Sequence, residues 1–197
     1  MHATLSTALL RAGHPAEADV VGRDASRLTR LEASFLTDWQ IVQVDHTAPP
    51  HPVRFHLAVS GPQVHLLTGD PAAFNRMTAA DRTEIGSTED AVQLARTFLE
   101  TTRPAGRLTY LIGSVDDIRF RPGLPAAESR RRDQIVARYR PVIAPPQATA
   151  VSDGFAVTAY VVRDSDLQRH ALAVAADGQV RDEVESLVPD LPTPYVI

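Results

Sequence analysis

Residues 53–68 read VRFHLAVSGPQVHLLT, and this stretch decides the fold and places the first candidate site. From Val53 to Ser60, apolar side chains alternate with polar or small ones, which is the period of a strand with one buried face. The turn Ser60-Gly61-Pro62 then reverses the chain, and Gln63 to Thr68 continues as a partner strand. We therefore predict an antiparallel β-hairpin.

One face of this hairpin carries side chains suited to acid–base chemistry. Pairing of Val59 with Val64 would bring His65 onto the same face as His56, and Arg54 follows one step along. Histidine titrates near neutral pH, while arginine stabilises an anionic or carbonyl oxygen. Because the opposite face is apolar enough to be the core, the histidines either face solvent or line a polar cavity.

Other segments carry helix or strand signals. Ser87 can cap a helix over 88–102, whose apolar side chains recur at three-to-four spacing and form one buried stripe. Asp24 is a candidate cap for a helix over 25–38, and residues 3–12 predict a short terminal helix. Further predicted elements are a helix over 71–80 and strands over 40–45, 107–112, 115–121, 155–163, 167–176 and 179–184.

The strongest turn signal is Asp177-Gly178, because both residues tolerate the positive φ of a type I′ turn. Residues 122–150 fit two structures, since 135–143 alternate like a strand while 128–139 also fit a helix. The proline-rich segment 141–146 is expected to be extended.

The element order predicts an α+β protein in which a curved, mainly antiparallel sheet packs against one long amphipathic helix, with shorter N-terminal helices. The same order is found in cone-shaped folds that enclose a cavity between sheet and helix. We predict an N-terminal arm or short helix over 1–23, a single domain over 24–188 and a proline-rich tail over 189–197.

The composition excludes several chemistries. The chain has no cysteine, and its 20 basic residues are all arginine, so lysine Schiff bases, cysteine nucleophiles and cysteine-ligated metals are excluded. A net charge of −4 gives no general attraction to nucleic acid or anionic lipid. No apolar run approaches the roughly 18 residues that span a bilayer, and no secretory signal opens the chain, so we expect a cytoplasmic protein without a membrane partner.

Two tyrosines and a basic cluster are further candidates. The hydroxyl groups of Tyr160 and Tyr110, in predicted strands, can reach either a ligand or a backbone carbonyl. The cluster from Arg130 to Arg140 is either a solvated face or a clamp for a carboxylate or phosphate at a pocket mouth. Arg138 and Arg140 of that clamp, together with Tyr110, are the candidate substrate-binding residues.

No metal or cofactor site is predicted. The spacings of five, five and nine residues between His46, His51, His56 and His65 match no known ligand pattern. Phosphate-binding loops and the other cofactor motifs are missing from the sequence. His170 shares its predicted face with apolar side chains, which favours a buried core histidine.

Three functional classes remain open. The first is a cofactor-independent isomerase, cyclase, dehydratase or lyase acting on a small organic molecule, with His56 and His65 as acid and base, Arg54 on an oxygen and Tyr160 as a hydrogen-bond donor. The second is a non-catalytic protein that binds a small molecule or a partner chain. Nucleic-acid binding through the arginine cluster ranks third. The first two differ in whether the histidines line an enclosed cavity. A homodimer is also expected, because open sheet edges pair across two-fold axes.

Overall fold

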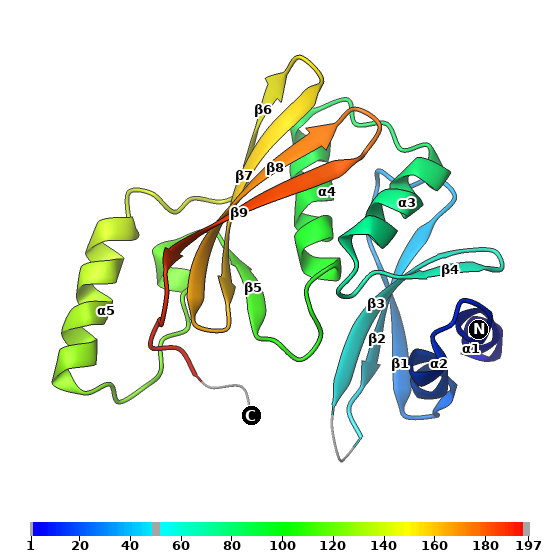
Figure 1. The fold of residues 1–197 in the computed structure, drawn as a ribbon, viewed down its shortest axis with the longest axis horizontal. Coiled ribbons are helices and arrows are strands. Elements are labelled where there is room, and N and C mark those ends of the chain that lie inside the picture. The colour runs from blue at the N-terminus through cyan, green and yellow to red at the C-terminus, as the bar shows by residue number, and fades with distance from the viewer. Residues whose placement is uncertain (1, 49–51, 195–197) are drawn as a thin grey trace. The chain divides into compact units, whose positions relative to one another are not determined.

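The computed structural model describes residues 2–48 and 52–194 and shows an α+β protein with two antiparallel sheets (Figure 1). The prediction of one sheet is wrong, because the strands form two sheets. The prediction of one long helix is also wrong, since α4 and α5 each span 14 residues. The helices are α1 (His2–Arg11), α2 (Pro15–Gly22), α3 (Pro71–Asp81), α4 (Thr88–Thr101) and α5 (Ala126–Tyr139), with a 3-10 turn, η1 (Val115–Asp117). The strands are β1 (Ser26–Leu31), β2 (Gln40–His46), β3 (Val53–Ser60), β4 (Gln63–Leu66), β5 (Thr109–Ile112), β6 (Gln147–Val151), β7 (Gly154–Arg163), β8 (Asp166–Ala175) and β9 (Val180–Val188).

The chain divides into two compact units, which we describe separately. The first part of α4 belongs to unit 2 and its last part to unit 1. This division falls inside the predicted domain 24–188. That residues 24–188 fold as a single domain therefore stays a prediction. Unit 1 comprises Met1–Ile85, Thr97–Ala105 and Asp177–Gln179, and unit 2 comprises Gly86–Arg96, Gly106–Ala176 and Val180–Ile197.

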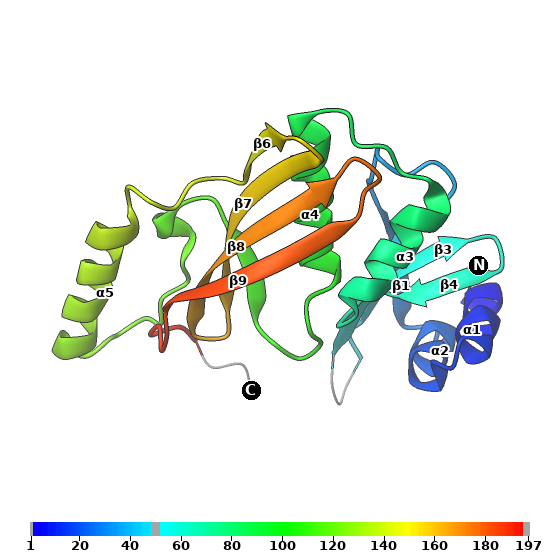
Figure 2. The ribbon, with the colours of Figure 1, turned by 45° about the horizontal axis from the view of Figure 1, so that its top comes forward.

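Unit 1 contains a four-stranded sheet in the order β1-β2-β3-β4 (Figure 2). Helix α1 contacts β4, and α2 contacts β1. The terminal helix predicted over 3–12 is confirmed, and α2 follows it without having been predicted. Their apolar side chains form one core with the strands, made by Leu5, Leu9, Ala18, Val21, Val44, Phe55, Leu57 and Val64.

The helix predicted over 25–38 is wrong, because residues 26–31 form the edge strand β1. Leu28 pairs with Val44 and Leu31 with Ile41 on β2. The helical spacing of the leucines is therefore coincidental, since pairing with β2 overrides a weak local helix preference. After Leu31 the chain continues as a loop to Trp39.

The other face of this sheet is also covered. Helix α3 contacts β4, and its Phe74 packs edge-on against Phe98 near the end of α4, with ring centroids 5.3 Å apart. The predicted helices over 71–80 and 88–102 are confirmed. The predicted cap Ser87 is present, since its Oγ accepts from Asp90 N (3.1 Å), and Asp70 caps the other helix by accepting from Ala73 N (3.0 Å).

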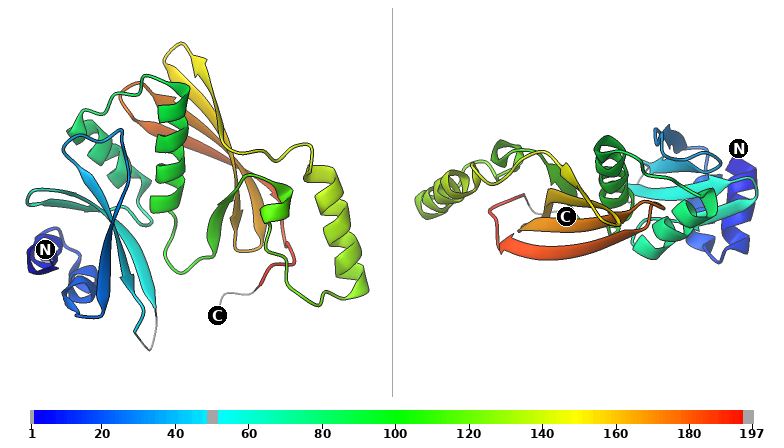
Figure 3. Two further views of the ribbon diagram at one scale, coloured as in Figure 1. Left: turned by 180° about the vertical axis from the view of Figure 1, so that it is seen from behind. Right: turned by 90° about the horizontal axis from the view of Figure 1, so that it is seen from above.

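Unit 2 contains the second sheet, in which β7, β8 and β9 run side by side as long, twisted strands (Figure 3). Both β5 and β6 pair with β7. Ile112 at the end of β5 pairs with Tyr160, and Gln147 at the start of β6 pairs with Thr158. Only Ala159 separates the two pairings, so β5 and β6 follow one another along β7. Residues 113–146, which we call the excursion, leave this line and rejoin it.

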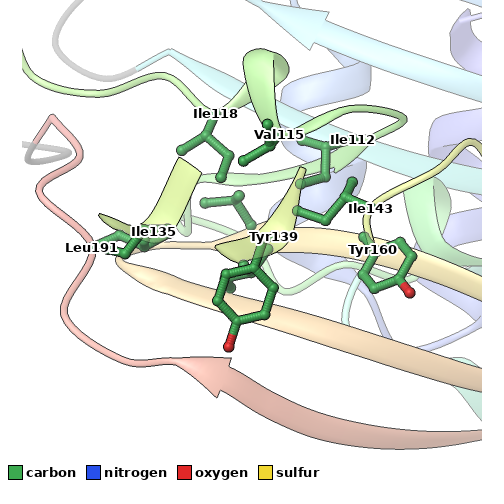
Figure 4. Close-up of a cluster of buried hydrophobic side chains, with 10 residues drawn as sticks. Ile112, Val115, Ile118, Ile135, Tyr139, Ile143, Tyr160 and Leu191 are labelled. Carbon is green, nitrogen blue, oxygen red and sulfur yellow. The ribbon is translucent and has the colours of Figure 1, made fainter. Parts of the chain in front are cut away.

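The excursion differs in part from prediction. The strand expected over 115–121 is wrong, because Ser114 caps η1 through a hydrogen bond from Asp116 N (3.2 Å) and turns the chain. The ambiguous range 122–150 contains helix α5 and strand β6. The excursion packs over one face of the sheet and forms a core with it (Figure 4): Ile112, Val115, Ile118, Ile135, Tyr139, Ile143, Tyr160, Val162, Leu167 and Leu191.

The predicted hairpin between β8 and β9 is confirmed, but its turn is not type I′. Within that turn only Gly178 has a positive φ (76°), whereas a type I′ turn needs two such residues. A Cβ atom at Gly178 would lie 2.9 Å from Thr83 Cγ2, so this position also lacks room for a side chain.

Candidate ligand-binding site

The predicted histidine-bearing face exists. Val59 pairs with Val64 and Ala58 with His65, as predicted, so His56 and His65 share one face. The opposing strand β2 adds further polar side chains, because Gln43 pairs with His56 and Asp45 with Arg54. We call this surface the histidine face: Gln43, Asp45, Arg54, His56, Ala58 and His65.

His56 is buried, with 1% of its surface exposed. Its backbone N–H donates to Thr68 Oγ1 (2.8 Å), and its Nε2 lies 3.4 Å from Gln43 Oε1. Burial lowers the pKa of His56 to about 4, and the positive charges of Arg103 and Arg54 add to this effect. His56 is therefore a neutral imidazole at pH 7.

A hydrogen-bonded chain continues from His56 toward the surface. Asp45 accepts from Gln43 Nε2 (2.6 Å) and from Arg54 Nε (2.5 Å). Burial alone would raise the pKa of Asp45, but these two hydrogen bonds and the charge of Arg54 hold it below its usual value. Arg54 is thus engaged by a carboxylate of its own sheet.

His65 lies flat against an aromatic ring. It stacks on Trp39 with ring centroids 5.0 Å apart and planes 5° from parallel. Burial lowers its pKa, and the charge of Arg76 acts in the same direction. A cavity of about 400 Å³ beside Trp39 is lined by neither His65 nor His56. The two predicted acid–base residues share a face without sharing this cavity.

The other candidate metal ligands do not converge on His56. His46 points to the opposite face of β2 and bonds through Nδ1 to Ser26 Oγ (3.0 Å). His51 lies outside the described residues. Within residues 2–48 and 52–194, no group of three histidine, aspartate or glutamate side chains is placed to hold a metal ion.

Sequence reasoning missed a buried carboxylate in unit 1. Asp81, at the end of α3, accepts from the backbone N–H groups of Thr37 (2.8 Å), Asp38 (2.7 Å) and Trp39 (2.8 Å). These bonds fasten the loop that carries Trp39. No local sequence signal connects positions so far apart.

His170 is fully buried, in line with the core position favoured for it, but it has an acidic partner that was not predicted. Its Nδ1 donates to Asp182 Oδ2 (2.8 Å) on β9. Its Nε2 is buried and has no hydrogen-bond partner among the described residues, as is also true of Gln168 Oε1 on the same strand face. Only the β8–β9 register brings His170 and Asp182 together.

Tyr160 and Tyr110 belong to unit 2, whereas the histidine face belongs to unit 1. Tyr160 lies in the excursion core (Figure 4). The Tyr110 hydroxyl accepts from Arg119 N (3.0 Å), and burial raises the pKa of Tyr110. Both side chains have structural roles in this core.

The two predicted clamp arginines are engaged elsewhere. Arg140 binds both carboxylate oxygens of Asp116 at 2.8 Å, which raises the pKa of Arg140. The guanidinium of Arg138 lies 5.3 Å from the centre of the Tyr139 ring. Neither side chain lines the cavity described next.

Unit 2 contains a cavity of about 540 Å³, which is within the range of small-molecule sites. Three arginines line it, and we therefore call it the arginine cavity. Arg107 precedes β5, Arg121 lies in the excursion and Arg131 lies on α5. Its other lining residues are Gly106, Glu128, Asp164, Ser165, Asp190, Leu191, Pro192, Thr193 and Pro194.

One wall of the cavity is the chain after β9. Leu191 N donates to Ser165 O (2.6 Å), and Thr193 Oγ1 donates to Asp164 O (3.0 Å). The carbonyl of Pro192 accepts from Arg121 N (2.8 Å). The proline-rich residues 189–194, predicted as part of a tail, are thus bound to the β7–β8 turn and the excursion.

Most charges in the cavity are paired. Arg107 pairs with Asp164 (3.1 Å) and Arg121 with Glu128 (2.6 Å). Arg131 is different, because its Nη2 donates to the carbonyl of Pro189 (2.9 Å) and it forms no ion pair within the described part of the chain. Arg131 belongs to the cluster flagged in the sequence, whereas nothing in the sequence indicated Arg107 or Arg121.

No family model, curated protein or solved structure matches this chain. Over residues 2–48 and 52–194, no helix combines the length and apolar character that crossing a membrane requires.

Proposed function

We propose that this chain is a non-catalytic small-molecule-binding protein whose ligand carries a carboxylate or phosphate held by Arg131 in the arginine cavity. One observation carries the proposal. The Arg131 guanidinium lies on the wall of a cavity of about 540 Å³, and its one described hydrogen bond is to a carbonyl oxygen. Arginine presents five donors in a planar fork that fits such anions in two-point contacts. Arg131 therefore has donors to offer a ligand.

The histidine face favours this class over an enzyme. Acid–base catalysis needs a titratable group that touches the substrate, with a pKa near the working pH. His56 is buried with a pKa of about 4, and His65 is stacked on Trp39. The isomerase or lyase hypothesis stays a prediction, and the geometry around His56 gives it no support.

A thermal-shift and calorimetric screen tests the proposal. The probes are inorganic phosphate and a series of mono- and dicarboxylates, each at millimolar concentration, because a ligand that binds the folded state raises Tm. We expect at least one probe to bind. Replacing Arg131 by Gln should lower the affinity for that probe by about tenfold or more, since a charge-assisted contact is lost.

The matched control is Arg130→Gln, which removes the same charge from the neighbouring exposed position, outside the cavity lining. This variant should bind like the wild type. Equal affinities of the wild type and the Arg131→Gln variant for every bound probe would refute the proposed site, and so would the absence of any bound probe.

A further inference from the structure

We infer that the ligand of the arginine cavity is a zwitterion, an α-amino acid or a close derivative, whose carboxylate faces Arg131 and whose ammonium group faces Asp190. This inference rests on the proposed function and adds the second charge. Its basis is the balance of charges that remains in the cavity after the internal ion pairs are formed.

The cavity lining contains three arginines and three carboxylates. Arg107–Asp164 and Arg121–Glu128 neutralise each other at 3.1 and 2.6 Å. Arg131 and Asp190 remain, and within the described residues Asp190 has neither an ion pair nor a side-chain hydrogen bond. The lining thus offers one uncompensated charge of each sign.

These two residues lie close together in the structure. Arg131 Nη2 donates to the carbonyl of Pro189 at 2.9 Å, and Asp190 is the next residue. Asp190 has a φ of 56°, a left-handed conformation that is uncommon for residues other than glycine. The hydrogen bond from Leu191 N to Ser165 O (2.6 Å) holds the chain directly after it. Both charged groups are therefore carried by anchored backbone.

Two backbone N–H groups of the cavity wall are already occupied. Those of Leu191 and Thr193 donate to Ser165 O and Leu191 O, at 2.6 and 2.7 Å. The charged donors in the lining are the arginine side chains. A ligand with only a negative charge would place that charge near the Asp190 carboxylate, whereas an ammonium group would neutralise it.

Matched probes test the charge requirement. The twenty common α-amino acids are screened by calorimetry. Each one that binds is then compared with its deaminated acid and its decarboxylated amine, for example leucine with 4-methylpentanoate and 3-methylbutylamine. We expect the amino acid to bind at least about tenfold more tightly than either analogue, because each analogue loses one charge-assisted contact.

The variant Asp190→Asn should remove the advantage of the amino acid over its deaminated analogue while leaving affinity for the deaminated acid equal or higher. Asp153→Asn is the control, since Asp153 is an exposed aspartate outside the cavity lining. Arg131→Gln should instead lower the affinity for the amino acid and for the deaminated acid by similar factors.

The outcomes separate the two proposals. If deaminated acids bind as tightly as amino acids and Asp190→Asn changes neither affinity, the zwitterion inference is overturned and the anion site stands. If inorganic phosphate binds but no amino acid or carboxylate does, the zwitterion inference is overturned and the anion site stands. If amino acids, carboxylates and phosphate all fail to bind, or if Arg131→Gln changes no affinity, both proposals fail.

Discussion

The histidine face of unit 1 and the arginine cavity of unit 2 both contain paired arginine and aspartate side chains, yet they differ in what surrounds those side chains. On the histidine face, His56 is 1% exposed and its neighbours bond to one another. In the arginine cavity, charged side chains surround about 540 Å³ of space. Polar groups gathered on one face need room beside them to bind a ligand, and the fold leaves that room in the arginine cavity but not around His56.

This difference has a testable form. Substitutions at His56 or at Asp81 should lower the free energy of unfolding without changing affinity for ligands of the arginine cavity. Substitutions at Arg131 or Asp190 should change that affinity with little effect on the free energy of unfolding.

Replacing Asp81 by Ala should lower the free energy of unfolding by about 4 kcal/mol, because three buried or partly buried backbone N–H groups lose a charged acceptor. Denaturant titration measures the effect. The exposed neighbour Asp38, replaced by Ala, is the control and should change stability little. A cost below about 1 kcal/mol for Asp81→Ala would mean that the loop is held by other contacts.

Lowering the pH should destabilise the protein through His56. The unfolded chain binds a proton at His56 below pH 6.5, whereas the folded protein binds one only near pH 4, so stability falls as pH drops through this window. The contribution of His56 amounts to roughly 3 kcal/mol between pH 7 and pH 4. Denaturant titrations across this range measure it.

The variant His56→Leu should lose this part of the pH dependence, while His14→Gln, at a more exposed position, should retain it. Identical pH profiles for the wild type and His56→Leu would contradict a buried neutral imidazole at this position.

Within unit 2, Tyr139 and Tyr160 lie in one core, and comparing them distinguishes the contribution of a hydroxyl hydrogen bond to stability from that of burial (Figure 4). Tyr139→Phe should cost about 1 kcal/mol of unfolding free energy, because the hydroxyl loses its bond to Leu187 O (3.0 Å). Tyr160→Phe is the matched control and should cost less, since the Tyr160 hydroxyl bonds to no described residue. Equal costs would remove the distinction, and neither change should alter affinity in the arginine cavity.

Local patterns predicted the elements whose partners are close in sequence. Alternation and the Ser60-Gly61-Pro62 turn predicted the correct register of β3 and β4, and the capping residue Ser87 marked a true helix start. The helix predicted over 25–38 was wrong because the three-residue spacing of Leu28 and Leu31 is helical, whereas pairing with β2 makes residues 26–31 a strand.

The candidate site was less predictable than the fold. Arg131 was recognised in the sequence as part of a basic cluster. Other residues that line the cavity with it come from distant positions near 107, 164 and 190, which the sequence did not connect with it. Alternation also placed His56 and His65 on one face without indicating that His56 would be only 1% exposed. What covers a face depends on tertiary packing, which local patterns do not contain.

The collinear arrangement of β5 and β6 has a consequence for how this chain tolerates change. The sheet would remain topologically complete if Ile112 were joined to Gln147 through a single residue opposite Ala159. The excursion supplies Arg121, Glu128 and Arg131, while the sheet frame and the chain after β9 supply the rest of the cavity. Under the proposed function, ligand preference would be modular: a different segment grafted between those two points, provided that it still shields Tyr160 and Val162, would give the same scaffold a new specificity.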